Sequence, residues 1–449
     1  MDAMTKQDFT VVPPHEDLFW RDVERLFRKS WFSRIWCLQE VILAADADVQ
    51  WGKEVAPWKI VAETATWIRS CPIQLLRGSA TGGVNNAHLM HMLGDDLKHN
   101  RLVSFLELLA LSWKFKSSDR RDKVYGLLGV PTTDCDPSLG NVFVQPDYMK
   151  GDAEVYRHCA FEIIRKTQSL RLLLHVQMTN NSNEDQGWKT LPSWVPRWHR
   201  YMYPMMAPSE QLSSFNACAA LPPSIPHIEN DTLSVQGRKF SRVRRTCSHS
   251  WDLDFNDEPQ SLISLAWKTY LASSWAYKKD EKLKAWCLVL TAGKDWNGEL
   301  VDDIPQHLAD MGAYIRSEDS HEYRNLYTAL SFKNSMRYPE ELLTALPSRP
   351  KIPAAKADGY RFDLAFRNAC QGRKLLLTDN GYVGLGPGLM KEGDLVCLLS
   401  GLVMPIILRP AGEGYQVVGE TYIHGIMFGE ASRKRGTDVG IELEDFMLL

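Results

Sequence analysis

The chain has 449 residues, of which 44% are hydrophobic and 24% are charged. This length predicts two or three domains, and the composition is typical of a soluble globular protein, which excludes disorder over either half. The 52 basic and 55 acidic residues give a formal net charge of −3. No stripe of Lys and Arg alternates with aromatic residues, so we expect no nucleic-acid partner.

The chain also lacks the usual signals for export. Residues 1–6 contain no apolar segment, and nowhere do about 18 uncharged apolar residues follow one another, so we expect neither secretion nor a membrane span. The nine cysteines are scattered and include no C-x-x-C pair. This usage favours free thiols in the cytoplasm and argues against a zinc module.

Hydrophobic periodicity predicts helices through most of the first part of the chain. Residues 78–83 are small and polar, which indicates a loop, and residues 170–176 suit a strand or a buried helix end. Within residues 119–129 we expect Asp119 as the N-cap and Gly129 as the stop. The other expected helices cover residues 16–29, 33–44, 58–69, 86–99, 103–113 and 152–166.

Prolines and tryptophans mark the middle of the chain. Residues 191–198 cannot be regular structure and predict an extended strap laid on the core, and residues 221–226 predict a linker. A strand is expected at residues 232–243, and helices at 262–290, 305–317 and 324–332, before a connector at 347–350. Short strands with turns between them are predicted at residues 374–378, 382–384, 395–399, 405–409 and 415–419, and the strand at 232–243 is a candidate to join them.

One stretch near the N-terminus carries the strongest candidate for chemistry. Ser33 is a good N-cap for a helix in which Ile35, Leu38 and Ile42 form the core face. On the neighbouring face Glu40 joins an apolar stripe with Trp36, Leu43 and Ala44. We expect this carboxylate to be buried and to need a partner.

This stretch resembles a known family. The residues Arg34-Ile35-Trp36 and Gln39-Glu40-Val41, followed by Trp51-Gly52, resemble a helix of the fungal heterokaryon-incompatibility (HET) domain. The segment from Asp119 to Val130, DRRDKVYGLLGV, is similar to a second motif of that family. Pro146-Asp147-Tyr148, residues 191–196 and residues 382–430 also resemble regions of its long members.

The resemblance implies non-self recognition between fused hyphae and programmed cell death. It also implies a distant similarity to TIR domains, in which a W-C-x-x-E helix carries the glutamate of NAD-cleaving members. Trp36-Cys37-Leu38-Gln39-Glu40 fits that pattern, which would make Glu40 the catalytic carboxylate, supported by Arg34, Trp36, Cys37, Gln39, Asp119, Arg121, Asp122 and Tyr125. Such a carboxylate could stabilise the oxocarbenium-like state of nicotinamide–ribose cleavage. Alternatively, Glu40 forms a structural ion pair with Arg120 or Arg121.

Two blocks that usually precede this helix in HET domains are missing, so we expect an N-terminally incomplete domain. The predicted fold is α+β and mainly α: a remnant of a TIR-like α/β HET domain (residues 1–178), a linker and strap (179–230), a helical region with one early strand (231–371) and a small antiparallel β-barrel-like module (372–449). We expect a non-catalytic incompatibility signalling protein that needs no cofactor and acts through protein partners or self-association. The alternatives are an NAD glycohydrolase that uses Glu40, with NAD as its substrate, and a small-molecule or peptide site in the C-terminal module.

Two weaker patterns are candidates for a metal site and a phosphate site. His88, His91, Asp95 and His99 lie near one side of a predicted helix, and a solvated face is favoured over a metal site because their spacing matches no known ligand set. Gly381, Gly384, Gly386 and Gly388 superficially suggest a phosphate loop, but Pro387 among them favours hairpin turns. We therefore predict no metal site.

Overall fold

The computed structural model describes residues 18–70, 79–178, 186–203, 205–207, 215–247, 276–278, 281–316, 357–431 and 443–449. The chain divides into two compact units. The first unit contains Met1–Glu162 and Trp198–Tyr201, and the second contains Ile163–Arg197 and Met202–Leu449. The domain limits expected at residues 178, 230 and 371 stay a prediction.

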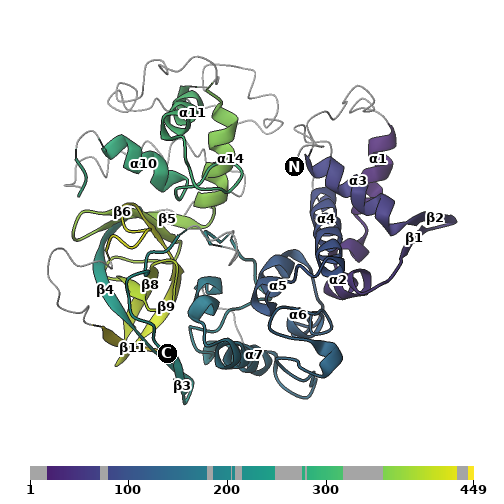
Figure 1. The fold of residues 1–449 in the computed structure, drawn as a ribbon, viewed down its shortest axis with the longest axis horizontal. Coiled ribbons are helices and arrows are strands. Elements are labelled where there is room, and N and C mark those ends of the chain that lie inside the picture. Colours follow the sequence, from purple (N-terminus) through teal and green to yellow (C-terminus); the bar gives the residue numbers. More distant parts are fainter. Residues whose placement is uncertain are drawn as a thin grey trace. The chain divides into compact units, whose positions relative to one another are not determined.

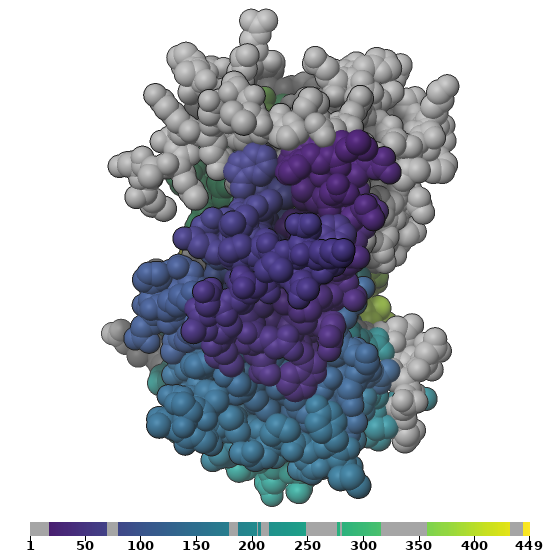
Figure 2. Space-filling view, turned by 90° about the vertical axis from the view of Figure 1, so that its right-hand side faces the viewer, coloured from purple at the N-terminus to yellow at the C-terminus, as the bar shows by residue number. Residues whose placement is uncertain are grey.

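In the described residues of the first unit, the regular structure is helical apart from the hairpin β1–β2 (Figure 1). In Figure 2 its N-terminal helices are purple to blue, and its later residues are teal-blue. The hairpin β1–β2 pairs Val49 with Ala56, and the sequence did not predict it. The elements in chain order are α1 (Leu18–Phe27), η2 (Ser30–Ser33), α2 (Ile35–Ile42), β1 (Asp48–Trp51), β2 (Glu54–Pro57), α3 (Trp58–Ser70), α4 (Ser79–Lys98), α5 (Phe105–Leu111), η3 (Ser112–Lys114), α6 (Asp122–Tyr125), η4 (Pro137–Leu139) and α7 (Asp152–Thr167), whose residues from Ile163 onward belong to the second unit.

The loop predicted at residues 78–83 is wrong for residues 79–83, which begin helix α4. Small residues serve here for close packing. A Cβ on Gly83 would lie 1.9 Å from the main-chain oxygen of Phe27, so glycine lets α4 approach the end of α1. The core at this contact comprises Trp20, Phe27, Phe32, Val61, Ala65, Ile68, Ala80, Val84 and Ala87.

Two predicted helix boundaries in the first unit are wrong. Arg34, with an extended backbone, is the N-cap of α2, while Ser33 ends the preceding 3-10 turn and donates its hydroxyl to Ser30 O (2.8 Å). The helix expected over residues 119–129 is only the single turn α6, which is capped at Gly126. The Asp119 side chain instead accepts from the Arg121 N–H (2.9 Å), a local bond that competes with helix formation.

The second unit is built on a nine-stranded sheet (Figure 1). The predicted C-terminal strands are confirmed, and the strand predicted at 232–243 joins them as β4. Asp379-Asn380-Gly381 makes the expected turn, with Gly381 at φ 83°, while Gly384 and Gly386 lie within β6. The strands are β3 (His227–Glu229), β4 (Thr232–Thr246), β5 (Arg373–Thr378), β6 (Val383–Pro387), β7 (Leu395–Leu399), β8 (Ile406–Ala411), β9 (Gly414–Glu420), β10 (Tyr422–Ile423) and β11 (Glu444–Leu448).

Pairing along β4 closes part of this sheet into a ring. β4 pairs with β11 over Leu233–Gly237 and with β7 over Gly237–Arg242, and the order β4-β11-β9-β8-β7 then returns to β4. A Cβ on Gly237 would lie 2.4 Å from Leu398 O, so glycine permits this closure. The module is not purely antiparallel as predicted, because β9 and β11 pair in parallel at Tyr415 and Leu448.

Helices and irregular segments complete the second unit. Residues 170–176, expected as a strand or helix end, form the 3-10 helix η5 (Leu170–His175), which contacts β9. The strap at 191–198 is irregular as predicted, made of turns rather than extended chain, and the linker at 221–226 has no helix or strand. The remaining helices are α8 (Gln186–Lys189), α10 (Lys282–Leu290), α11 (Ile304–Arg316) and α14 (Gly359–Cys370), the last not predicted.

The α+β class is confirmed in the described residues. The helix predicted at 262–290 is found only over Lys282–Leu290. Residues 276–278 are not helical, so the prediction is wrong there, and residues 262–275 and 279–280 lie outside the described residues. The helix predicted at 324–332 and the connector at 347–350 also lie outside the described residues. Across the described ranges, no helix combines the length and apolarity needed to cross a lipid bilayer.

Candidate functional site

Glu40 does not occupy the buried position expected for it. Helix α2 buries Ile35, Leu38 and Ile42 as predicted, but Glu40 is on its exposed side. Of the predicted stripe, Trp36 is half-buried, and Leu43 is 47% exposed. A carboxylate that is exposed to water is solvated, so Glu40 does not need the partner that a buried carboxylate would require.

The structural ion pair suggested for Glu40 is also wrong. Arg121 pairs with Asp119 (2.6 Å) and Arg120 with Asp152 (3.3 Å). Among the described residues, no basic side chain forms an ion pair with Glu40. The carboxylate is therefore accessible but has no cation that fixes its orientation.

Cys37 lies next to Glu40 in space and is fully buried. Burial, and then the negative charge of Glu40, raises the pKa of the Cys37 thiol to about 11, while the nearby Arg34 lowers it to a lesser degree. The thiol is therefore protonated at neutral pH, and it is a poor nucleophile.

The first motif packs directly on the second. A Cβ on Gly126 would lie 3.2 Å from Ile35 Cγ2, and one on Gly129 would lie 2.8 Å from Gln39 Oε1. The glycines thus let the chain after α6 lie against helix α2. Gln39 acts here as a packing residue at the contact between the two motifs.

The second motif holds the loop at residues 147–150. The Arg121 guanidinium is fixed by Asp119 and donates to Tyr148 O (2.5 Å) and Lys150 O (2.9 Å). Its carbon lies 5.0 Å from the centre of the Tyr148 ring, which adds a cation–π contact. Hydrogen bonds from Arg121 stabilise the charged form of Asp119 and so lower the pKa of this carboxyl.

Tyr125 and Asp122 fix the same loop. The Tyr125 hydroxyl donates to Asp147 O and accepts from Asp147 N, both at 3.1 Å. The Tyr148 hydroxyl donates to Asp122 Oδ1 (2.7 Å), and burial and this bond raise the pKa of Tyr148 to about 12. Asp119, Arg121, Asp122 and Tyr125 therefore form one cluster around residues 147–150.

Lys123, which no sequence pattern singles out, is a buried lysine in the second motif. Its ammonium donates to Trp113 O (2.9 Å) and to Phe115 O at the end of η3. The residue is 7% exposed, and burial lowers the pKa of Lys123 to about 8. A lysine among charged residues usually indicates solvent exposure, so nothing in the sequence near Lys123 indicates that it is buried and bonded to two carbonyls.

The predicted histidine face is partly engaged. His88 Nδ1 lies 3.0 Å from Thr66 Oγ1, and burial lowers the pKa of His88 to about 4. His99 Nδ1 lies 3.4 Å from Asp95 Oδ1 at the exposed end of α4. In the part of the chain that the structure describes, no three His, Cys, Asp or Glu side chains are arranged to hold a metal ion.

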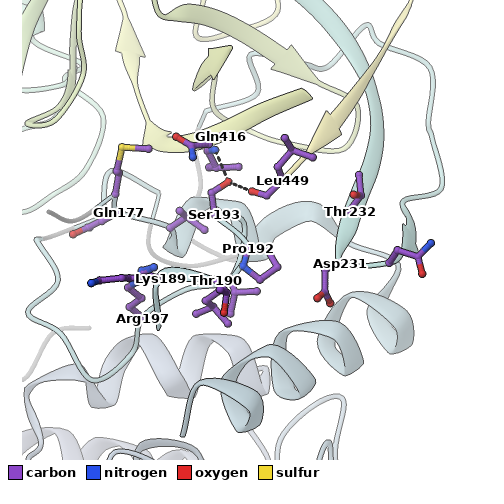
Figure 3. A pocket seen from close by; sticks show the side chains of 16 residues that line it. Gln177, Lys189, Thr190, Pro192, Ser193, Arg197, Asp231, Thr232, Gln416 and Leu449 are labelled. Carbon is purple, nitrogen blue, oxygen red and sulfur yellow. Dashed lines mark hydrogen bonds between the residues drawn. The ribbon is translucent and has the colours of Figure 1, made fainter. Parts of the chain in front are cut away.

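A polar pocket of about 520 Å³ lies in the second unit, beside the strap (Figure 3). Ser193 of the strap joins two strands there: its N–H donates to Leu449 O (2.7 Å), its hydroxyl donates to the same oxygen, and its Oγ accepts from Val417 N (2.9 Å). The pocket is lined by Val176, Gln177, Met178, Lys189, Thr190, Leu191, Pro192, Ser193, Val195, Arg197, Asn230, Asp231, Thr232, Gln416, Val417 and Leu449.

Comparison with known proteins bears on both units. Residues 260–448 match the family model of the Het-6 beta-barrel domain, a range that contains α10 to α14 and β5 to β11. The chain is also 26% identical over 496 aligned positions to "Heterokaryon incompatibility protein 6, OR allele" of Neurospora crassa, an alignment that covers 97% of this chain and 68% of that protein. No solved structure is significantly similar to the chain.

Proposed function

We propose, on the premise that this chain is a heterokaryon-incompatibility protein with a Het-6 β-barrel domain, that it acts in non-self recognition between fused hyphae without catalysing a reaction. The observation that carries the incompatibility role is the similarity to an incompatibility protein along 97% of the chain. The proposal places it in the cytoplasm, where it acts through protein partners or self-association and leads to cell death.

The surroundings of Glu40 support the non-catalytic part. A catalytic carboxylate is held within hydrogen-bond reach of the reacting group and oriented by its neighbours. Glu40 is exposed on the eight-residue helix α2, beside a buried thiol, and the predicted support residues Arg121 and Tyr125 bind the loop at residues 147–150. The similarity of the first unit to TIR domains is implied only by the sequence resemblance to the HET domain.

The test replaces Glu40 by Gln in the full chain. We expect hyphal fusion between strains that differ in this protein to kill the same fraction of fused cells, measured by vital-dye uptake, with the variant as with the wild type. We also expect that neither the purified wild type nor the purified Glu40→Gln variant consumes NAD when incubated with it, since the proposal assigns Glu40 no catalytic step.

Glu54→Gln is the matched control, because Glu54 is an exposed glutamate in the same unit. If NAD is consumed by the wild type and by Glu54→Gln but not by Glu40→Gln, with equal thermal stability, the chain is instead an NAD glycohydrolase that uses Glu40. If neither variant nor wild type causes cell death on fusion, the incompatibility role itself is wrong.

A further inference from the structure

We propose that the pocket beside the strap binds a small molecule that carries a carboxylate or phosphate group, with Lys189 and Arg197 holding the anionic end and Asp231 facing the other end. This inference concerns the second unit and does not depend on Glu40. It rests on three features of the pocket: fixed walls, a suitable size and a separation of charges.

Hydrogen bonds hold the pocket's walls at the point where β9 and β11 stop pairing with each other. β9 and β11 are joined at one residue pair, Tyr415 with Leu448, and Ser193 of the strap then bridges the strands in place of further ladder bonds. Met178 N also donates to Val418 O (3.0 Å). The strap and the segment at residues 176–178 are thus both bonded to β9, as expected for a binding site that exists before its ligand arrives.

Two further wall segments are held by side-chain bonds. The Gln177 amide donates to Tyr203 O and accepts from Tyr203 N, both at 2.9 Å. The Trp194 indole donates to Asp231 O (2.9 Å), which ties the strap to the turn before β4. The volume of about 520 Å³ lies within the roughly 300–1,000 Å³ of small-molecule sites.

The charges of the pocket are separated along its length. Figure 3 shows Lys189 and Arg197 together at one end, with Asp231 and Thr232 at the other and Pro192 and Ser193 between them. Lys189 is exposed and forms no ion pair with any described residue. Arg197 donates to Trp188 O (2.9 Å), which orients its guanidinium.

Such an arrangement selects for one class of ligand. Paired Lys and Arg donors bind oxyanions through charge-assisted hydrogen bonds, which are about twice as strong as neutral ones. The Asp231 carboxylate disfavours a second anion at the far end and accepts from a hydroxyl or amine. A compact molecule with an oxyanion at one end and a hydrogen-bond donor at the other is complementary to both.

The experiment is equilibrium dialysis of the full chain against radiolabelled inorganic phosphate and, separately, radiolabelled succinate at matched ionic strength. We expect saturable binding of at least one probe at one site per chain. Lys189→Glu should weaken this binding at least tenfold, because it replaces an attractive charge by a repulsive one. The probe that binds identifies the anionic group as phosphate or carboxylate.

Lys284→Glu is the matched control, because Lys284 is an exposed lysine on α10 outside the pocket lining. Its affinity for the probe should equal that of the wild type, and circular dichroism should show that both variants are folded. Absence of saturable binding of both probes, or equal affinity in Lys189→Glu and wild type, would overturn the proposal. Neither result changes the incompatibility role, which is measured by cell death on fusion.

Discussion

Lys123 shows how a single side chain in the second motif serves the fold. Its ammonium closes the end of η3 by donating to Trp113 O and Phe115 O, and the residue is buried. A buried charge is tolerated here because both carbonyls are strong acceptors. Lys123 therefore ties α6 to residues 113–115 and does not project into solvent.

We expect Lys123→Met to lower the free energy of unfolding by about 1–3 kcal/mol, because it leaves the two carbonyls without their donor. The deficit should depend on pH. The folded pKa of Lys123 is about 8 and the unfolded pKa is 10.5, so between these values the unfolded chain holds a proton that the folded chain has released. The wild type therefore gains stability as pH rises through this window, and the variant lacks that gain.

Urea denaturation at pH 7, 8, 9 and 10 measures this effect. Lys116→Met is the control, because Lys116 is an exposed lysine in the same segment. Its stability should follow that of the wild type at every pH. A difference between wild type and Lys123→Met that stays constant from pH 8 to pH 10 would contradict the proposed burial of the ammonium.

Residue-scale prediction from sequence succeeded for the core face of α2 and failed for polar partners. Ile35, Leu38 and Ile42 are buried as the helical period indicated. The partners of Arg121, by contrast, lie two residues away at Asp119 and more than 25 residues away in the loop at 147–150. Local spacing contains no information about the second contact, which is why Arg121 was placed beside Glu40.

At the scale of elements, the contact between α1 and α4 depends on glycine. Gly82 and Gly83 are neighbours on α4, but they differ in their surroundings. A Cβ on Gly83 would overlap Phe27 O at 1.9 Å, whereas one on Gly82 has nothing within 4 Å. The main chain of α1 cannot yield as a flexible side chain would.

We expect Gly83→Ala to lower the free energy of unfolding by about 1–3 kcal/mol, because the two helices must separate. Gly82→Ala should raise it by about 0.5–1 kcal/mol, since alanine is the better helix former and meets no neighbour. Thermal denaturation of both variants provides the comparison. Equal shifts of the same sign would show that the helices are not in close contact here.

The same glycines explain why this element was predicted incorrectly. Residues 78–83 have the composition of a loop, but Ala80, Val84 and Ala87 recur at helical spacing and face the core. Small residues at a close helix contact and small residues in a loop look alike in sequence. The hairpin β1–β2 was missed for a different reason: its strands are only four residues long, no residue of either is fully buried, and β2 shows no apolar alternation.

At the scale of the whole molecule, strand content was predictable and strand partners were not. The short C-terminal strands follow from apolar runs between turn residues. The ring closes at β4, where Gly237 pairs with both Glu444 on β11 and Leu399 on β7, residues at least 160 positions away. No local pattern specifies these partners, and the separation of the chain into two units follows equally from long-range packing.

One buried ion pair connects distant parts of the second unit. Arg373 on β5 and Glu420 on β9 are joined at 2.8 Å, with side chains 4% and 3% exposed. Arg373 also donates to Ala369 O (2.9 Å), and Glu420 Oε1 accepts from Met206 N (2.7 Å). The second oxygen, Glu420 Oε2, is buried and has no hydrogen-bond partner among the described residues.

Breaking this pair from one side should cost more than removing both charges. We expect Arg373→Met to lower the free energy of unfolding by about 3–5 kcal/mol, because Glu420 keeps a buried charge without its cation. Glu420→Gln should be destabilising for the converse reason, and the double variant should be more stable than the sum of the two single effects by at least about 1 kcal/mol.

Chemical denaturation of the four proteins completes the cycle. The exposed pair Lys239–Glu444, with side chains 41% and 44% exposed, is the control, and its coupling should stay below about 1 kcal/mol. Strict additivity of Arg373→Met and Glu420→Gln would mean that the two charges are stabilised separately, by Ala369 O and Met206 N. Coupling restricted to the buried pair would mean that burial, rather than ion pairing itself, makes Arg373 and Glu420 depend on each other across the second unit.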